Sequence, residues 1–226
     1  MIKRFCRLSP LSFVLIACLT VPGCSIFSTI ARTMPKIVPA AYAGLKGKDT
    51  VVMVWADRAI ATDWPSITID ITASTQKKLL NAQAADKPDE LDGTTFPASP
   101  QSVARFQMDH PEAELMPITQ VAPMVGVKRL IYVEVVNFQT RSDLSVNTDL
   151  FRGQITANVK VVEWDGTKAK IAYEESKITA IWPKKAPQDG VLNIGDAKTY
   201  VGTVDAFTTT LALRFFKHEE EREVGE

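Results

Sequence analysis

The stretch Ile155–Trp182, ITANVKVVEWDGTKAKIAYEESKITAIW, carries the clearest structural signal in this chain of 226 residues. Its first part alternates apolar and polar residues, which is the period-two pattern of a strand with one buried face. Asp165-Gly166 then supplies the residue types that favour a type I′ turn. The sequence therefore predicts a long β-hairpin, with Ile171 and Tyr173 on one face of the returning strand. The alternating apolar residues are Ile155, Ala157, Val159 and Val161.

Two further apolar runs predict additional strands of the same sheet. Thr50–Asp57 (TVVMVWAD) is continuously apolar and β-branched, which indicates burial on both faces, as in a central strand. Leu130–Gln139 (LIYVEVVNFQ) predicts a second strand, which we place at the centre of the sheet.

Helical patterns separate these strands. Ile67, Ile71 and Leu79 recur at helical spacing after Asp63 and Pro65, so we expect a helix that continues through the strong helix formers of 76–85. A strand over Ser66–Ala73 stays open, because isoleucines at 67, 69 and 71 also alternate. The other expected helices are Gln101–Asp109 after the cap Ser99, Ile118–Val125 before Gly126, and Tyr200–Phe215.

These elements predict one domain of the α/β class (α+β-like). We expect a single mixed sheet with a long β-hairpin and helices packed mainly on one face. The folded domain is expected to span residues 50–217, and residues 218–226 are expected to form a disordered acidic tail.

The N-terminus has the pattern of an export signal. Lys3, Arg4 and Arg7 precede the apolar run Leu11–Val21. As a helix this run is only about 16 Å long. A hydrocarbon core of about 30 Å requires roughly twenty apolar residues, so a transmembrane anchor is disfavoured.

Val21-Pro22-Gly23-Cys24 follows directly and resembles the lipobox of bacterial lipoproteins. The resemblance implies a signal peptide over 1–23, cleavage between Gly23 and Cys24, and acylation of Cys24. Residues 24–49 then form a lipid-anchored tether. Ser25, in place of an aspartate, points to the outer membrane, facing the periplasm. The alternative is an ordinary secretory signal that happens to contain a cysteine.

The order of the elements over Thr50–Lys217 resembles a group of envelope lipoproteins. These are the penicillin-binding-protein activator lipoproteins and the curli-secretion lipoprotein, whose cores share an α/β layout with the N-terminal domain of the Tol-system propeller protein. The passage Gly126–Val133 (GVKRLIYV) contributes to the likeness. No functional residue is carried over from it.

Composition narrows the functional classes. Basic and acidic residues balance at 26 each, without the clustered basic face that nucleic-acid binding requires. Cys6 and Cys18 would leave with the signal peptide and Cys24 would carry lipid, so the mature chain is expected to contain no disulfide and no thiol nucleophile.

No catalytic, cofactor-binding or metal-binding residue is predicted. His110 stands among the carboxylates of 109–114, but Pro111 interrupts any helix that would align them, so a solvated loop is favoured over a metal site. Asp57-Arg58 is interpreted as a structural ion pair rather than a ligand site. Trp182-Pro183, just past a strand end, is the candidate for an exposed contact.

Three functions remain in competition. The favoured hypothesis is a non-enzymatic envelope protein, anchored to the membrane by lipid, that tethers or docks another envelope protein. The alternative is a lipoprotein that binds lipid or another small amphiphile for envelope transport, which requires an apolar cavity of several hundred Å³ between helices and sheet. A hydrolase built on scattered carboxylates is the third.

Overall fold

A computed structural model of the chain describes residues 35–85, 88–142 and 149–220. The chain divides into two compact units, of which the larger is Pro39–His218. β1 (Lys36–Val38) pairs with β8 (His218–Glu220) as a two-stranded sheet, and the smaller unit contains β1 and the last two residues of β8. The predicted signal peptide 1–23 and the predicted lipidation residue Cys24 lie outside the described residues.

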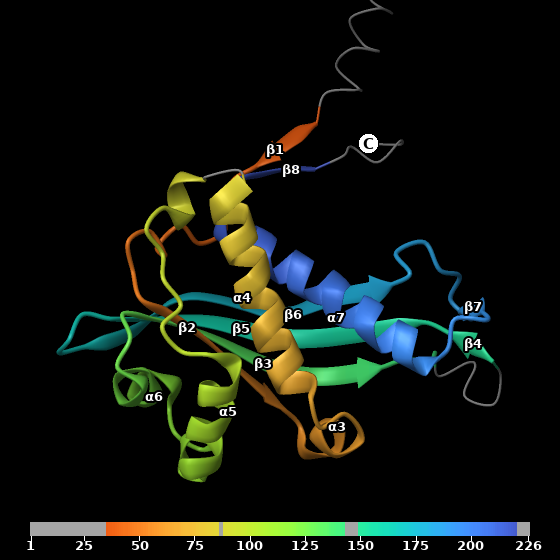
Figure 1. Ribbon diagram of the computed structural model, residues 1–226, viewed down its shortest axis with the longest axis horizontal. Helices are drawn as coiled ribbons and strands as arrows, with labels where there is room; N and C mark the ends of the chain where they lie inside the picture. The colour runs from red at the N-terminus through yellow and green to blue at the C-terminus, as the bar shows by residue number, and fades with distance from the viewer. Residues whose placement is uncertain (1–34, 86–87, 143–148, 221–226) are drawn as a thin grey trace, which may run out of the picture. The chain divides into compact units, whose positions relative to one another are not determined.

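The larger unit is built on a mixed four-stranded sheet in the order β2-β3-β5-β6 (Figure 1). β2 and β3 run parallel, whereas β5 is antiparallel to both β3 and β6. The long hairpin predicted from the alternating pattern is β5–β6. The strands are β2 (Thr50–Ala56), β3 (Arg129–Gln139), β5 (Gly153–Trp164) and β6 (Ala169–Trp182), with β4 (Leu150–Phe151) and β7 (Val191–Leu192) as a separate two-stranded sheet.

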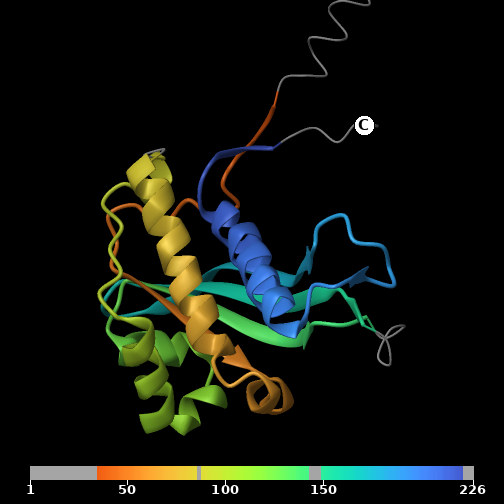
Figure 2. The same ribbon diagram turned by 45° about the vertical axis from the view of Figure 1, so that its right-hand side comes forward.

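Helices cover the two faces of the sheet unequally. The two longest, α4 and α7, lie side by side on one face, and the shorter α5 and α6 lie on the other (Figure 1 and Figure 2). The α/β class, with most of the helical length on one face, is confirmed. The helices are α3 (Arg58–Asp63), α4 (Ile67–Ala85), α5 (Pro100–Asp109), α6 (Ile118–Val125) and α7 (Asp196–Ala212), with 3₁₀ turns η2 (Asp89–Leu91), η3 (Pro111–Glu114) and η5 (Leu213–Phe215).

The core consists of two apolar clusters, one on each face of the sheet. Val133 and Val159 are fully buried with Phe207 of α7 in the larger cluster. Met53 and Leu130 pack with residues of α5 and α6 in the smaller one. Fully burying a side chain of this size contributes about 1.5–3 kcal/mol, so both faces contribute to stability.

Local signals set the helix ends as the sequence predicts. The Ser99 hydroxyl accepts a hydrogen bond from the Ser102 amide at 3.1 Å and so caps α5. Gly126, with φ of +77°, ends α6 in the left-handed conformation that glycine adopts without strain. The apolar residues of α4 are buried at helical spacing, as at Ile67 and Ile71, so the helix is confirmed and the strand alternative is excluded.

β2 is an edge strand of this sheet, which corrects the central position suggested by its apolarity. Val51 to Val54 are nevertheless fully buried, because α4 packs on one face and α5 approaches the other. A continuously apolar strand is therefore one whose two faces are both covered by helices. The pattern does not indicate how many strands lie beside it.

The hairpin turn differs from the type I′ prediction. Type I′ needs positive φ at both central residues. Here only Gly166, with φ of +105°, has it, and the Asp165 amide donates to the Lys168 carbonyl at 3.3 Å. The carboxylate of Asp165 also accepts from the amides of Lys168 and Thr167, and these bonds lower its pKa to about 2. A side chain that caps the turn thus replaces the expected backbone geometry.

A β-bulge in β6 overturns the prediction that Ile171 and Tyr173 share a face. Ile171 pairs with Val162, whereas Tyr173 pairs with Val161, with a register shift between them. Because Val161 and Val162 belong to the clusters on opposite faces, the two β6 side chains also point to opposite faces. One extra residue reverses the alternation on which the prediction relied.

The compact unit begins earlier than residue 50. Tyr42 is only 8% exposed and Leu45 is fully buried, so residues 39–49 pack on the domain and are not part of a free tether. At the other end, His218–Glu220 form β8 where a disordered tail was predicted. The remainder of that tail, 221–226, lies outside the described residues.

Candidate functional site

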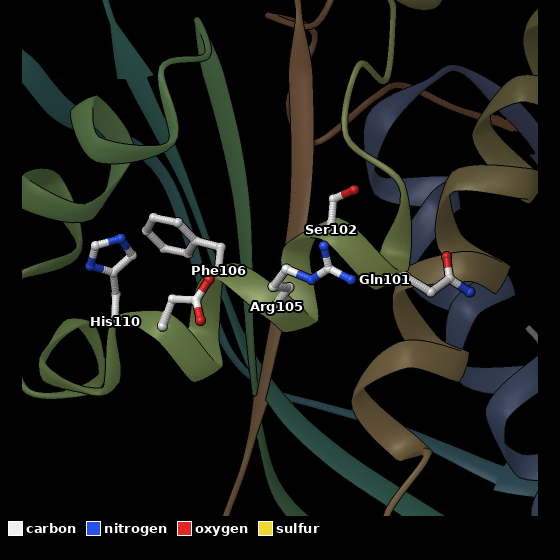
Figure 3. A pocket seen from close by; sticks show the side chains of 6 residues that line it. Gln101, Ser102, Arg105, Phe106 and His110 are labelled. Carbon is white, nitrogen blue, oxygen red and sulfur yellow. The ribbon is translucent and has the colours of Figure 1, made fainter.

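An open hollow of about 330 Å³ lies along one side of α5 (Figure 3). Its lining comes from successive turns of this single helix, because residues three to four apart share a helix face. Most of the lining groups are polar or charged. Small-molecule sites are usually enclosed and mainly apolar, so the hollow is better suited to surface contact. The lining residues are Gln101, Ser102, Arg105, Phe106, Asp109 and His110.

His110 ends α5 and stabilises the turn that follows. Its amide donates to the Phe106 carbonyl at 2.9 Å, and its ring lies 4.7 Å from the Phe106 ring. Its Nδ1 lies 3.1 Å from a carboxylate oxygen of Glu112. The Glu112 backbone amide first, and His110 second, lower the pKa of Glu112. Within the described residues, no group of three His, Cys, Asp or Glu side chains is placed to hold a metal.

A polar cluster fastens the start of the folded unit to the hairpin. The Tyr42 hydroxyl donates to the Glu163 carboxylate at 2.9 Å. Arg129 and Lys170 approach the same carboxylate at 3.4 and 3.1 Å. Arg129 also donates to the Gly44 carbonyl at 2.8 Å, so it joins the incoming segment to the sheet. We call Tyr42, Gly44, Arg129, Glu163 and Lys170 the Tyr42 clasp.

A second carboxylate reinforces the clasp. Glu175 accepts two hydrogen bonds from the Arg214 guanidinium, at 3.0 and 3.1 Å, and one from the Tyr173 hydroxyl. The Arg214 carbonyl accepts from the Tyr42 amide at 3.0 Å. The incoming segment is therefore bonded both to the hairpin and to the turn that follows α7.

The pKa values in this region follow from burial and from these bonds. Burial first, and the bond to Glu163 second, raise the pKa of Tyr42. Burial alone would raise the pKa of Glu163, but hydrogen bonds from Tyr42 and Lys170 and the charge of Arg129 bring it below its ordinary value. Glu163 is therefore a charged structural acceptor at neutral pH, and Tyr42 is a neutral donor.

The remaining predicted residues have structural roles. Asp57 caps α3 by accepting from the Ala59 amide at 2.8 Å, which gives its carboxylate a role other than the expected pair with Arg58. Trp182 is half-buried rather than freely exposed. It packs so closely on α7 that a Cβ on Gly202 would lie 2.3 Å from its ring.

The two adjacent acids of β6, Glu174 and Glu175, project to opposite faces of the sheet. Glu174 lies 3.2 Å from Lys160, whereas Glu175 is bound by Arg214. Their partners in β5 are the neighbouring residues Lys160 and Val159, which also point to opposite faces.

The sequence did not reveal the Tyr42 clasp. The Tyr42 hydroxyl bonds to a residue 121 positions away, and the Gly44 carbonyl to one 85 positions away. None of the clasp residues belongs to a catalytic or binding motif. The available signal was the pair Tyr42 and Leu45, two large apolar residues three apart within a proline- and glycine-rich segment. That spacing is compatible with one packed turn, but it does not identify Glu163 or Arg129 as partners.

No protein-family model matches this chain, and no curated protein matches it. Lipoprotein GNA1162 from Neisseria meningitidis aligns over 59% of this chain and 82% of its own, at 11% identity and a TM-score of 0.38. Hypothetical protein CT253 from Chlamydia trachomatis aligns over 59% of this chain and 72% of its own, at 17% identity and a TM-score of 0.35. A chain of the PelC dodecamer from Paraburkholderia phytofirmans aligns over 82% of this chain and 100% of its own, at 11% identity and a TM-score of 0.36. With TM-scores below 0.5, these likenesses assign neither a family nor a function.

Proposed function

We propose that this chain is a lipid-anchored protein of a bacterial cell envelope, attached through Cys24 and facing the periplasm from the outer membrane. Its α/β domain tethers or docks another envelope protein and performs no catalysis itself. The observation that carries the anchor is the order of features in the first 24 residues. Three basic residues, the apolar run Leu11–Val21 and the tetrapeptide Val21–Cys24 follow in this order within the first 24 residues.

The packed start of the domain limits how far such an anchor reaches. Because residues 39–49 belong to the compact unit, 14 residues (25–38) separate Cys24 from Pro39. A chain of that length spans at most about 50 Å when fully extended. Several acyl chains at Cys24 would hold the domain at the bilayer, since each buried CH₂ contributes about 0.8 kcal/mol. Among the described helices, none is long and apolar enough to cross a membrane.

The competing amphiphile-binding role requires an apolar cavity between the helices and the sheet. The hollow on α5 does not fit it, because this hollow opens on the outside of the helix and is lined mainly by polar groups such as Arg105 and Asp109. The buried strand residues facing α4 and α7, including Val133 and Val159, are instead in contact with the helices. Docking is therefore favoured over carriage of a lipid.

The anchor is tested by Cys24→Ala, with Cys18→Ala as the matched control in the same segment. We expect the Cys24 variant to lose incorporation of a labelled fatty acid and to leave the membrane fraction after a high-salt wash. The Cys18 variant is expected to behave as the parent protein. Retention of label and of membrane attachment by Cys24→Ala would overturn the proposal.

A further inference from the structure

The two most exposed large apolar side chains in the described residues stand close together in the chain. Leu115 is 89% exposed and Met108 is 80% exposed. They flank η3, where α5 ends and the chain turns toward α6, and we call residues 108–115 the α5–η3 corner (Figure 1). Single exposed apolar residues need no explanation, but two large ones at the two ends of one eight-residue segment are a candidate contact site.

The backbone of the corner is held firmly in place. Pro111 begins η3, and the buried Ala113 packs into the smaller apolar cluster beneath it. The amides of Ala113 and Leu115 donate to the carbonyls of His110 and Glu112, each at 3.0 Å. Leu115 is thus presented on an ordered turn, so a partner that covers it loses little conformational entropy from this side of the interface.

The charged side chains of the corner itself are acidic, and Arg105 lies one turn earlier on α5, where it lines the hollow together with Asp109. Asp109, Glu112 and Glu114 lie within the corner, which contains no lysine or arginine. Among the ion pairs found in the described residues, only His110 approaches a corner carboxylate. The field of Glu114 also reaches the sheet: burial first, then Glu134 and Glu114, raise the pKa of Tyr132 to about 12.

This charge pattern distinguishes between three kinds of surface as occupants of the corner: an anionic bilayer, a second copy of the chain, and a basic protein surface. An anionic bilayer surface would be repelled by three carboxylates, and the same corner of a second copy would place like charges opposite one another. A basic surface complements the carboxylates, and an apolar recess within it accommodates Leu115. An apolar centre surrounded by a polar rim is the common anatomy of protein–protein interfaces.

We propose that the α5–η3 corner docks a partner protein through a basic surface that contains an apolar recess, with Leu115 as the central anchor and Met108 beside it. The carboxylates of Asp109, Glu112 and Glu114 orient the encounter. This proposal rests on the docking role proposed above and gives it a location and a partner chemistry.

The test places a photo-crosslinking amino acid at residue 115 of the full-length chain in its native cells. The matched control carries the same group at Val201, which is 65% exposed on α7. We expect a protein adduct from position 115 and none from position 201. We also expect Glu112→Lys with Glu114→Lys to lower the adduct yield about tenfold, because attraction becomes repulsion. Mass spectrometry should place the crosslinked residue on a lysine- or arginine-rich surface of the partner.

Each other outcome contradicts the corner proposal. These outcomes are no adduct at 115 from lipidated protein, an adduct to lipid, an adduct to a second copy, and a yield unchanged by the charge reversal. Fatty-acid labelling of the same sample separates the two proposals, since an unlabelled chain would show that the anchor has failed. Circular dichroism of the charge-reversed variant checks its fold, which these exposed positions should not alter.

Discussion

The Tyr42 clasp and the α5–η3 corner both contain carboxylates. Those of the clasp are bonded to basic and hydroxyl groups of the chain, whereas those of the corner are exposed to solvent. In the clasp, the Glu163 carboxylate accepts a hydrogen bond from Tyr42 and pairs with Arg129 and Lys170, and its side chain is 22% exposed. In the corner, Asp109 and Glu114 face solvent beside an exposed leucine. Charge compensated within the chain fixes the fold, whereas charge left to solvent next to apolar surface is available to another molecule. Substitutions in the two regions should therefore separate stability from binding.

The largest effect is expected from Tyr42→Ala. This change removes a buried ring that lies 6.1 Å from the Tyr173 ring and 6.4 Å from the Phe215 ring, together with the hydrogen bond to Glu163. Truncation of a buried aromatic residue costs about 3 kcal/mol of unfolding free energy. Urea unfolding of the purified domain measures it. A loss below about 1 kcal/mol would show that residues 39–49 contribute little to the folded unit.

A smaller loss is expected from Glu175→Gln. The amide keeps the shape of the carboxylate but not its charge, so the paired bonds from Arg214 weaken. Hydrogen bonds to charged groups contribute about 1.5 kcal/mol at the low end of their range, and partial exposure favours that end. Glu174→Gln is the matched control on the other face of the strand, where the acid is more exposed and should cost less. Equal losses at the two positions would contradict the role given to Arg214.

The clasp should also make stability depend on pH. The folded-state pKa of Glu163 lies below its ordinary value of 4.5. Its contribution is therefore complete above that value and disappears as the pH falls through the folded pKa. The parent protein should lose more stability between about pH 6 and pH 3 than Glu163→Gln, which lacks this titration. Parallel curves of unfolding free energy against pH would contradict the assignment.

The smallest effect on stability is expected in the corner. Leu115→Ser removes almost no buried surface, so the unfolding free energy should change by less than about 0.5 kcal/mol. Crosslinking through a probe at Met108 should nevertheless fall strongly in this variant, because the anchor of the interface is gone. Destabilisation by more than about 1 kcal/mol would mean that Leu115 is part of the core and not a contact for a partner.

Much of the fold was predictable because it is encoded locally. The alternating pattern that begins at Ile155 predicted the hairpin. Ser99 predicted the start of α5, and Gly126 predicted the end of α6. Two of the failures lie where a single residue changes the local geometry. The bulge in β6 separates Ile171 from Tyr173, and the side chain of Asp165 replaces a type I′ turn with another arrangement.

The sites were less predictable, because their residues are brought together only by tertiary packing. Tyr42 and Glu163 are 121 positions apart, so no local pattern relates them. The stretch 109–114 stood out for its density of potential metal ligands. The residues that flank this stretch, Met108 and Leu115, are exposed. Their exposure depends on which residues the neighbouring elements cover, and that cannot be inferred from a local sequence pattern. The predictions at Gly23 and Cys24 concern residues outside the described structure, and they stay predictions.

Mass spectrometry of the N-terminal peptide from membrane-extracted protein determines whether Cys24 carries the lipid anchor. We expect a mature chain that begins at Cys24, with lipid on the thiol and an acylated amine. A mature chain that begins elsewhere, or a Cys24 with an unmodified thiol, would contradict the envelope anchor and the docking role built on it.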